Sequence, residues 1–172
     1  MNSPMNSPMN ATLDPQDHFE LTQLYANYAS AVSSGEWELW PEFFTEECSY
    51  RLQPRENFER GFPLATLSFE SKGMLKDRVY GIRETLFHDP YYQRNVCGIP
   101  LVRKFVREPA GDRFECEANY AVFRTKLSEL SSVFSVGRYI DVIVRTPQGL
   151  KFESRQVIYD SEMIPNSIIY PI

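Results

Sequence analysis

The spacing of apolar residues changes along this chain of 172 residues, and that change restricts the fold more than any other feature. Up to about residue 86 apolar residues recur at helical spacing, whereas from residue 99 onward they alternate or form short runs, as they do in strands. Helices followed by strands favour an α+β architecture. We therefore predict a curved antiparallel sheet that N-terminal helices cover on one face.

Three helical segments are predicted ahead of the four strand segments of the C-terminal half. Asp14 can cap a first helix that begins at Pro15 and stops at Gly35. Its apolar face comprises Leu21, Leu24, Tyr25, Tyr28, Ala31 and Val32. A short aromatic helix is expected over residues 37–44, and a third helix over about residues 72–86. The apolar face of the third consists of Leu75, Val79, Ile82 and Leu86.

Strand patterns occupy most of the remaining sequence. Residues 48–53 alternate like a strand, whereas Pro and Gly interrupt residues 54–69, which we interpret as a loop with room for one short strand. Four later segments, joined by short turns, are predicted to form an antiparallel meander: residues 99–106, 114–125, 132–146 and 150–160. Gly137 lies inside the third segment, where it can mark a bend or bulge.

The first residues differ from the rest in composition. Residues 1–13 repeat a tetrapeptide of small, polar and Pro residues, which bury too little apolar area to offset the entropy of ordering them. We predict a disordered tail at 1–13 and a single domain at 14–172, a size at which one hydrophobic core is usual.

Net charge and cysteine content exclude several classes of partner. Eighteen basic and 23 acidic residues give a net charge of -5, which does not attract nucleic acid or anionic membranes. No apolar run reaches the roughly 18 to 20 residues of a membrane helix, and no secretion signal is recognisable, so a cytoplasmic location is expected. The three cysteines are far apart and form no CxxC pair, which predicts reduced thiols.

Residues 73–95 are the stretch richest in reactive groups, because they contain three arginines and the pair His88-Asp89. A carboxylate beside an imidazole can serve a general base or a metal site. Adjacent side chains in extended backbone point to opposite faces, however, and Asp89 before Pro90 suits a turn. We favour a capping or interface histidine followed by a turn aspartate.

The histidine content argues against metal chemistry in this chain. It contains only His18 and His88, and it lacks the paired Cys-x-His motifs that a Rieske cluster requires. A mononuclear iron site with two histidines would need both of them side by side. No dinucleotide-binding, phosphate-binding or hydrolase-elbow motif is present either. We therefore assign no catalytic, metal-binding or cofactor-binding residue to this chain.

The same stretch supplies candidates for a subunit interface, where arginine and tyrosine are enriched. They are Arg78, Tyr80, Arg83, His88, Tyr91, Tyr92 and Arg94. The three arginines could instead bind a carboxylated substrate. We favour ion pairing or subunit contact, because nothing nearby completes a catalytic set.

Two segments resemble a known family, the small (beta) subunits of aromatic-ring-hydroxylating oxygenases. They are WPEFFTEECSYRL at 40–52 and GMLKDRVYGIRETLFHDPYYQRN at 73–95, and the resemblance extends from about residue 17 to residue 172. It implies a cone-like fold shared with nuclear transport factor 2, scytalone dehydratase and ketosteroid isomerase. It also implies a non-catalytic, structural role beside a large (alpha) subunit, usually in a three-plus-three hexamer.

In that family the large subunit carries a Rieske [2Fe-2S] cluster and a mononuclear non-heme iron, and NADH supplies electrons through separate components. Segments 54–67 and 88–95 look most similar to salicylate 5-hydroxylase small subunits, followed by terephthalate and benzoate-type dioxygenases. The resemblance leaves open whether one or two oxygen atoms enter the ring. The alternatives are a stand-alone isomerase or dehydratase of the same fold, with His88, Asp89 and Tyr50 or Tyr80 in a pocket, and a ligand-binding module.

Overall fold

The computed structural model describes residues 13–85, 87–109, 111–163 and 168–172. The predicted tail therefore lies outside the described residues except for Leu13, whose side chain packs partly buried against the core. The helical elements are α1 (Pro15–Ser34), the 3-10 helix η1 (Trp37–Phe43), α2 (Arg55–Glu59), α3 (Lys72–Tyr80) and the π-helix η2 (Gly81–Thr85). The strands are β1 (Phe44–Pro54), β2 (Leu67–Phe69), β3 (Tyr91–Cys97), β4 (Leu101–Val106), β5 (Arg113–Lys126), β6 (Ser132–Thr146) and β7 (Gly149–Tyr159).

Helix α1 begins and ends at the predicted signals. The Asp14 carboxylate accepts a hydrogen bond from the Asp17 N–H at 2.8 Å, and the Asp17 carboxylate accepts from the Asp14 N–H at 3.4 Å. This reciprocal pair forms a capping box that satisfies two N-terminal donors. At the other end Gly35 adopts φ 72°, the left-handed conformation that glycine tolerates best. All six residues of the predicted apolar face are buried.

The strands form a sheet in the order β2-β1-β7-β6-β5-β3, with β4 also paired to β5. The predicted meander is confirmed, because β4–β5, β5–β6 and β6–β7 are antiparallel pairs. Strand β1 instead pairs with β7 in parallel. No hairpin joins these two strands, and the long connection between them leaves their relative direction free.

Strand β3 was not predicted, since the sequence indicated a turn followed by a contact segment there. It pairs antiparallel with β5, from Tyr91 opposite Lys126 to Cys97 opposite Tyr120. Its inward-facing buried residues include Gln93 and Asn95, which are polar. The alternation of apolar and polar residues that identifies a half-buried strand is therefore absent.

Two other segments differ from the prediction. Residues 54–69 contain the short helix α2 as well as the short strand β2. The helix predicted at 72–86 is α-helical only to Tyr80 and continues as a π-helix to Thr85, and Leu86 lies outside the described residues. Leu75, Val79 and Ile82 are buried as predicted.

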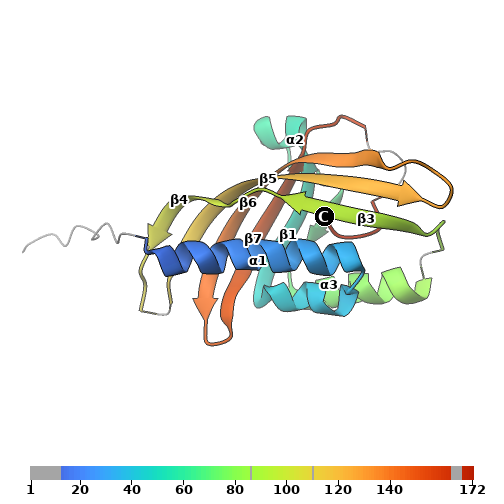
Figure 1. Ribbon diagram of the computed structural model, residues 1–172. Helices are drawn as coiled ribbons and strands as arrows, with labels where there is room; N and C mark the ends of the chain where they lie inside the picture. Colours follow the sequence, from blue (N-terminus) through green and yellow to red (C-terminus); the bar gives the residue numbers. More distant parts are fainter. Residues whose placement is uncertain (1–12, 86, 110, 164–167) are drawn as a thin grey trace, which may run out of the picture.

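Helices α1 and α3 lie on the same side of the curved sheet, whereas α2 sits apart from them near the end of β1 (Figure 1). The space between these helices and the sheet, called the interior below, holds the core. Its largest fully buried side chains include those of Trp40, Tyr25, Tyr28, Tyr50 and Tyr139. The predicted α+β architecture is thus confirmed, with an unusually aromatic interior. No helix within the described ranges is long and apolar enough to cross a bilayer.

Gly137 permits a close approach of β6 to β7. A methyl group at this position would lie 1.9 Å from the main-chain oxygen of Ile158. We expect Gly137→Ala to lower the free energy of unfolding by about 2 kcal/mol or more, because main-chain atoms of a central strand would have to move. Gly73→Ala in α3 is the matched control. A methyl group there would lie 3.6 Å from the hydroxyl of Ser71, which is an ordinary contact distance. Chemical denaturation measures the free energy of unfolding of both variants. If Gly137→Ala were as stable as Gly73→Ala, the prediction would be contradicted.

Candidate functional site

The interior contains a buried ion pair that sequence analysis did not predict. Asp141 of β6 and Arg155 of β7 are directly opposite each other, and both side chains are completely buried. Arg155 Nε donates to Asp141 Oδ1 at 3.0 Å, and Nη2 donates to Oδ2 at 2.7 Å. The Tyr25 hydroxyl also donates to Oδ2. Bidentate geometry with an added donor offsets part of the cost of removing both charges from water.

Four aromatic rings surround the Arg155 guanidinium. Its central carbon lies between 3.9 and 5.0 Å from the ring centroids of Phe152, Tyr139, Tyr28 and Tyr25. Burial opposes the charge, but the Asp141 carboxylate raises the pKa of Arg155 well above its ordinary value, so the guanidinium stays charged. Such ring contacts add cation–π attraction in a desolvated setting. Side chains of the chain itself therefore occupy the interior around Arg155.

The interior tyrosines act as hydrogen-bond donors. Burial raises the pKa of Tyr25, Tyr28 and Tyr50 above the ordinary value, so their hydroxyls remain protonated at neutral pH. Tyr28 and Tyr50 donate to the main-chain oxygen of Ile172, and Tyr25 donates to Asp141. The arrangement is structural, because these groups are already committed to partners within the chain.

Metal and thiol chemistry have little support in the part of the chain that the structure describes. Within it, no group of three or more His, Cys, Asp or Glu side chains is placed to hold a metal ion. Burial raises the pKa of the Cys48 and Cys97 thiols to about 11 and that of Cys116 to about 12. All three thiols are free and remain protonated at neutral pH, which makes them poor nucleophiles.

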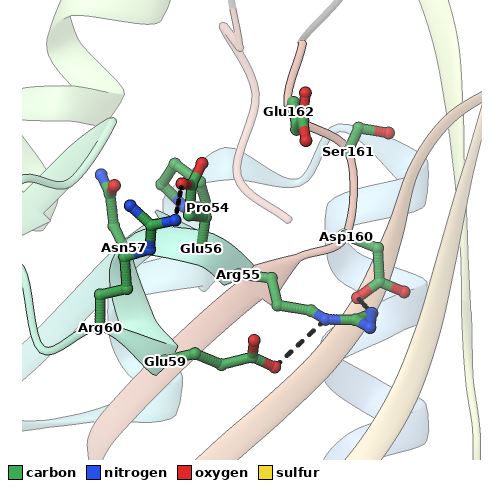
Figure 2. A pocket seen from close by; sticks show the side chains of 9 residues that line it. All are labelled: Pro54, Arg55, Glu56, Asn57, Glu59, Arg60, Asp160, Ser161 and Glu162. Carbon is green, nitrogen blue, oxygen red and sulfur yellow. Dashed lines mark hydrogen bonds and ion pairs between the residues drawn. The ribbon is translucent and has the colours of Figure 1, made fainter.

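A surface hollow lies between α2 and the end of β7 (Figure 2). Two basic and four acidic side chains line it, and three ion pairs form among them: Arg55 pairs with Glu59 at 3.2 Å and with Asp160 at 2.9 Å, and Arg60 pairs with Glu56 at 3.0 Å. Paired, solvated charges of this kind are common on helix surfaces and contribute little. Both arginines are thus paired with carboxylates, and the lining keeps an excess of acidic over basic side chains.

The seven predicted interface residues do not form a single surface. Arg78 points inward, where its Nη2 donates to the main-chain oxygens of Ile168 at 3.0 Å and Ile169 at 2.8 Å. Burial lowers its pKa from the ordinary value. Tyr80 and Arg83 are exposed on α3 and η2, and Arg83 forms an ion pair with Glu38.

His88 and Tyr91 belong to an aromatic cluster at the surface. The His88 ring lies 5.2 Å from that of Tyr170 and 5.7 Å from that of Tyr91, between centroids. His88 Nδ1 lies 2.9 Å from the main-chain oxygen of Asp89, a hydrogen bond that places the proton on Nδ1. His88 therefore bonds to the backbone of its neighbour Asp89, which lies in an irregular segment ahead of β3. Burial raises the pKa of Tyr91 to about 12.

Tyr92 and Arg94 lie on the outer face of the sheet, opposite to the interior. Arg94 stands opposite Phe123 of β5, which stands opposite Val133 of β6. Tyr92, Val96, Phe123 and Val133 are exposed by 79%, 53%, 37% and 58%. We call Tyr92, Arg94, Val96, Phe123 and Val133 the outer-face patch. Contiguous exposed apolar groups of this kind mark interaction surfaces.

The chain matches, over residues 28–166, the family described as ring hydroxylating beta subunit. It belongs to this family. Among its relatives, the anthranilate 1,2-dioxygenase small subunit of Burkholderia cepacia is 32% identical over 164 residues, which cover 95% of this chain and 99% of the relative. The beta 1 subunit of the terminal oxygenase component of terephthalate 1,2-dioxygenase from a Comamonas species is 26% identical, over 91% of this chain and 99% of its own.

A solved structure supports the same assignment. A beta subunit assigned to the aromatic-ring-hydroxylating dioxygenases, from Novosphingobium aromaticivorans, superimposes with a TM-score of 0.78 at 28% identity. The match covers 90% of this chain and 96% of that one. The predicted nuclear transport factor 2-like fold is thereby confirmed, and the chain is a beta subunit of an aromatic-ring-hydroxylating dioxygenase.

The buried ion pair of this beta subunit should dominate its stability. We expect Asp141→Asn to lower the free energy of unfolding by about 3–5 kcal/mol, because Arg155 would keep its charge in the interior without a counter-charge. Arg113→Gln is the control, since its ion pair with Glu153 is about one-third exposed and should contribute less than about 1 kcal/mol. Urea denaturation measures the free energy of unfolding of both variants. If Asp141→Asn and Arg113→Gln lowered it by similar amounts, burial of the Asp141–Arg155 pair would be unimportant for stability.

Proposed function

We propose that this chain is the non-catalytic, structural subunit of the terminal oxygenase component and that it binds its large subunit through the outer-face patch. The observation that carries the proposal is the contrast between the two faces of the sheet. The inner face is filled by Arg155, Asp141 and the surrounding rings, whereas the outer face presents exposed Tyr92, Phe123 and Val133. Burying such a face against a partner stabilises both chains.

Beta subunits of ring-hydroxylating dioxygenases partner with large alpha subunits. We propose that the large subunit supplies the Rieske [2Fe-2S] cluster and the mononuclear iron, with NADH as the electron source through separate components. The ligand count of this chain supports the division, since it contains two histidines in all. We further propose a cytoplasmic three-plus-three hexamer in which residues 14–172 act as one domain.

The relatives suggest the substrate class. Their names specify anthranilate and terephthalate, which are both aromatic acids. We therefore propose that the complete oxygenase acts on an aromatic acid, with the 2-substituted benzoates salicylate and anthranilate as the first candidates. The large subunit selects between them, and between insertion of one or two oxygen atoms, because the interior of this chain is occupied by its own side chains.

A stand-alone isomerase or dehydratase is less well supported. It would require His88, Asp89 and Tyr50 or Tyr80 to converge in a pocket. Tyr50 is fully buried and hydrogen-bonded to Ile172, whereas Tyr80 is 65% exposed. His88 lies in the surface aromatic cluster instead.

Charge introduced into the outer-face patch should weaken assembly. We expect Phe123→Asp to reduce co-purification with a co-expressed large subunit at least tenfold, because a carboxylate would be buried in an apolar contact. Leu64→Asp is the matched control, since Leu64 is 73% exposed and lies outside the patch. Size-exclusion chromatography and pull-down with the tagged large subunit measure both. If both variants assembled like the unaltered chain, the proposed binding face would be wrong.

Removal of the His88 imidazole should leave iron loading intact. We expect the complex with His88→Ala to keep the same iron content and Rieske absorbance per large subunit as the unaltered complex. Among the described residues, His88 contacts the Asp89 backbone and the rings of Tyr91 and Tyr170. Metal analysis and visible spectroscopy on the purified complex check this. Loss of iron at unchanged subunit ratio would place His88 at the metal centre and refute the structural role.

A further inference from the structure

Residues 168–172, called the strap below, enter the interior from the end of the chain. Ile168 and Ile172 are 6% and 0% exposed and form part of the hydrophobic core. The strap belongs to no strand or helix. Its position therefore depends on side chains of other elements.

Two side chains bind main-chain oxygens along the strap. Arg78 of α3 donates from Nη2 to Ile168 at 3.0 Å and to Ile169 at 2.8 Å. Gln93 of β3 donates from Nε2 to Pro171 at 2.7 Å. Because these bonds reach main-chain oxygens, they select an extended backbone rather than particular strap side chains.

Two tyrosines bind the last residue. The Tyr28 and Tyr50 hydroxyls donate to the main-chain oxygen of Ile172 at 2.8 and 3.0 Å, and Ile172 N–H donates to the Tyr50 hydroxyl at 3.1 Å. Trp40 Nε1 in turn donates to the Tyr28 hydroxyl at 3.1 Å. The donors come from α1, β1 and η1, so the strap is enclosed by several elements at once.

The strap also contributes one ring to the surface aromatic cluster. The Tyr170 ring stacks on that of Trp37, with 4.6 Å between centroids and an interplanar angle of 17°. It lies 4.7 Å from the ring of Tyr91. Stacking of this kind fixes the orientation of the strap between its two buried isoleucines.

The groups that hold the strap are not saturated by it. Within the described residues, Arg78 Nε and Gln93 Oε1 are buried and have no hydrogen-bond partner. Gln93 is 4% exposed, so water does not reach its amide freely. Pro171 has no N–H to offer to the Gln93 oxygen. Buried polar atoms without a partner are uncommon in folded proteins, so these two are available to a further hydrogen-bonding group, such as a ligand or an ordered water.

We propose that the mouth of the interior is a peptide-binding site, which takes an extended apolar segment and which residues 168–172 of the same chain occupy. Arg78, Gln93, Tyr28 and Tyr50 are its binding residues. The proposal stands apart from assembly with the large subunit, since every contact that supports it lies within this chain.

The test severs the strap after the whole chain has folded. A protease recognition sequence replaces the exposed residues 161–163, and the purified protein is then cleaved. The probe is a labelled synthetic peptide, acetyl-Ile-Ile-Tyr-Pro-Ile, with the reversed sequence as control. Binding is followed by fluorescence anisotropy and by emission of Trp37 and Trp40, which are the two tryptophans of the chain.

We expect the severed strap to remain bound through gel filtration and to exchange with the labelled peptide but not with the reversed one. Arg78→Met and Gln93→Leu should each weaken peptide binding about tenfold or more, because each removes donors to buried main-chain oxygens. Arg83→Met is the matched control, since Arg83 pairs with exposed Glu38 instead. Equal binding of both peptides, loss of the strap without rebinding, or unfolding that the peptide does not reverse would each overturn the proposal.

Discussion

The Arg155–Asp141 ion pair is the interaction on which the rest of the structure depends. It fixes the register of β6 against β7, and through the Tyr25 hydroxyl it fixes α1 against both strands. Removing two charges from water costs several kcal/mol per ion, so the pair is stable only while its hydrogen bonds and surrounding rings stay in place. The sheet, the first helix and the aromatic core are therefore mutually dependent.

This dependence also determines what occupies the described part of the interior. A general base needs a free lone pair and an approach for substrate. In this chain the interior carboxylate is engaged by Arg155 and Tyr25, and the strap lies over Tyr28 and Tyr50. Exposed apolar and aromatic side chains of the sheet, among them Tyr92, Phe123 and Val133, lie on the outer face instead.

Sequence patterns predicted the elements whose packing is apolar and missed those whose packing is polar. Helix α1 and strands β5 to β7 follow regular hydrophobic repeats between clear turn and cap signals, and the structure contains them. Strand β3 was not predicted because polar residues, Gln93 and Asn95, occupy its inward positions. The ion pair between Asp141 and Arg155 was not predicted, although the sequence contained an indication of it. Each of the two residues lies at an inward position in the middle of a strand whose other inward residues are mostly apolar. Which opposite charges meet depends on register, which spacing alone does not give.

Strand β3 connects the two regions that carry function in this interpretation. Its side chains alternate between faces, so Gln93 points inward to the strap while Tyr92 and Arg94 point outward within the outer-face patch. A shift of β3 by one residue would exchange these sets and would lose both the strap contact and the patch. The contact between Gln93 and the strap and the exposure of the outer-face patch therefore depend on the same register, that of Tyr91–Cys97 against β5.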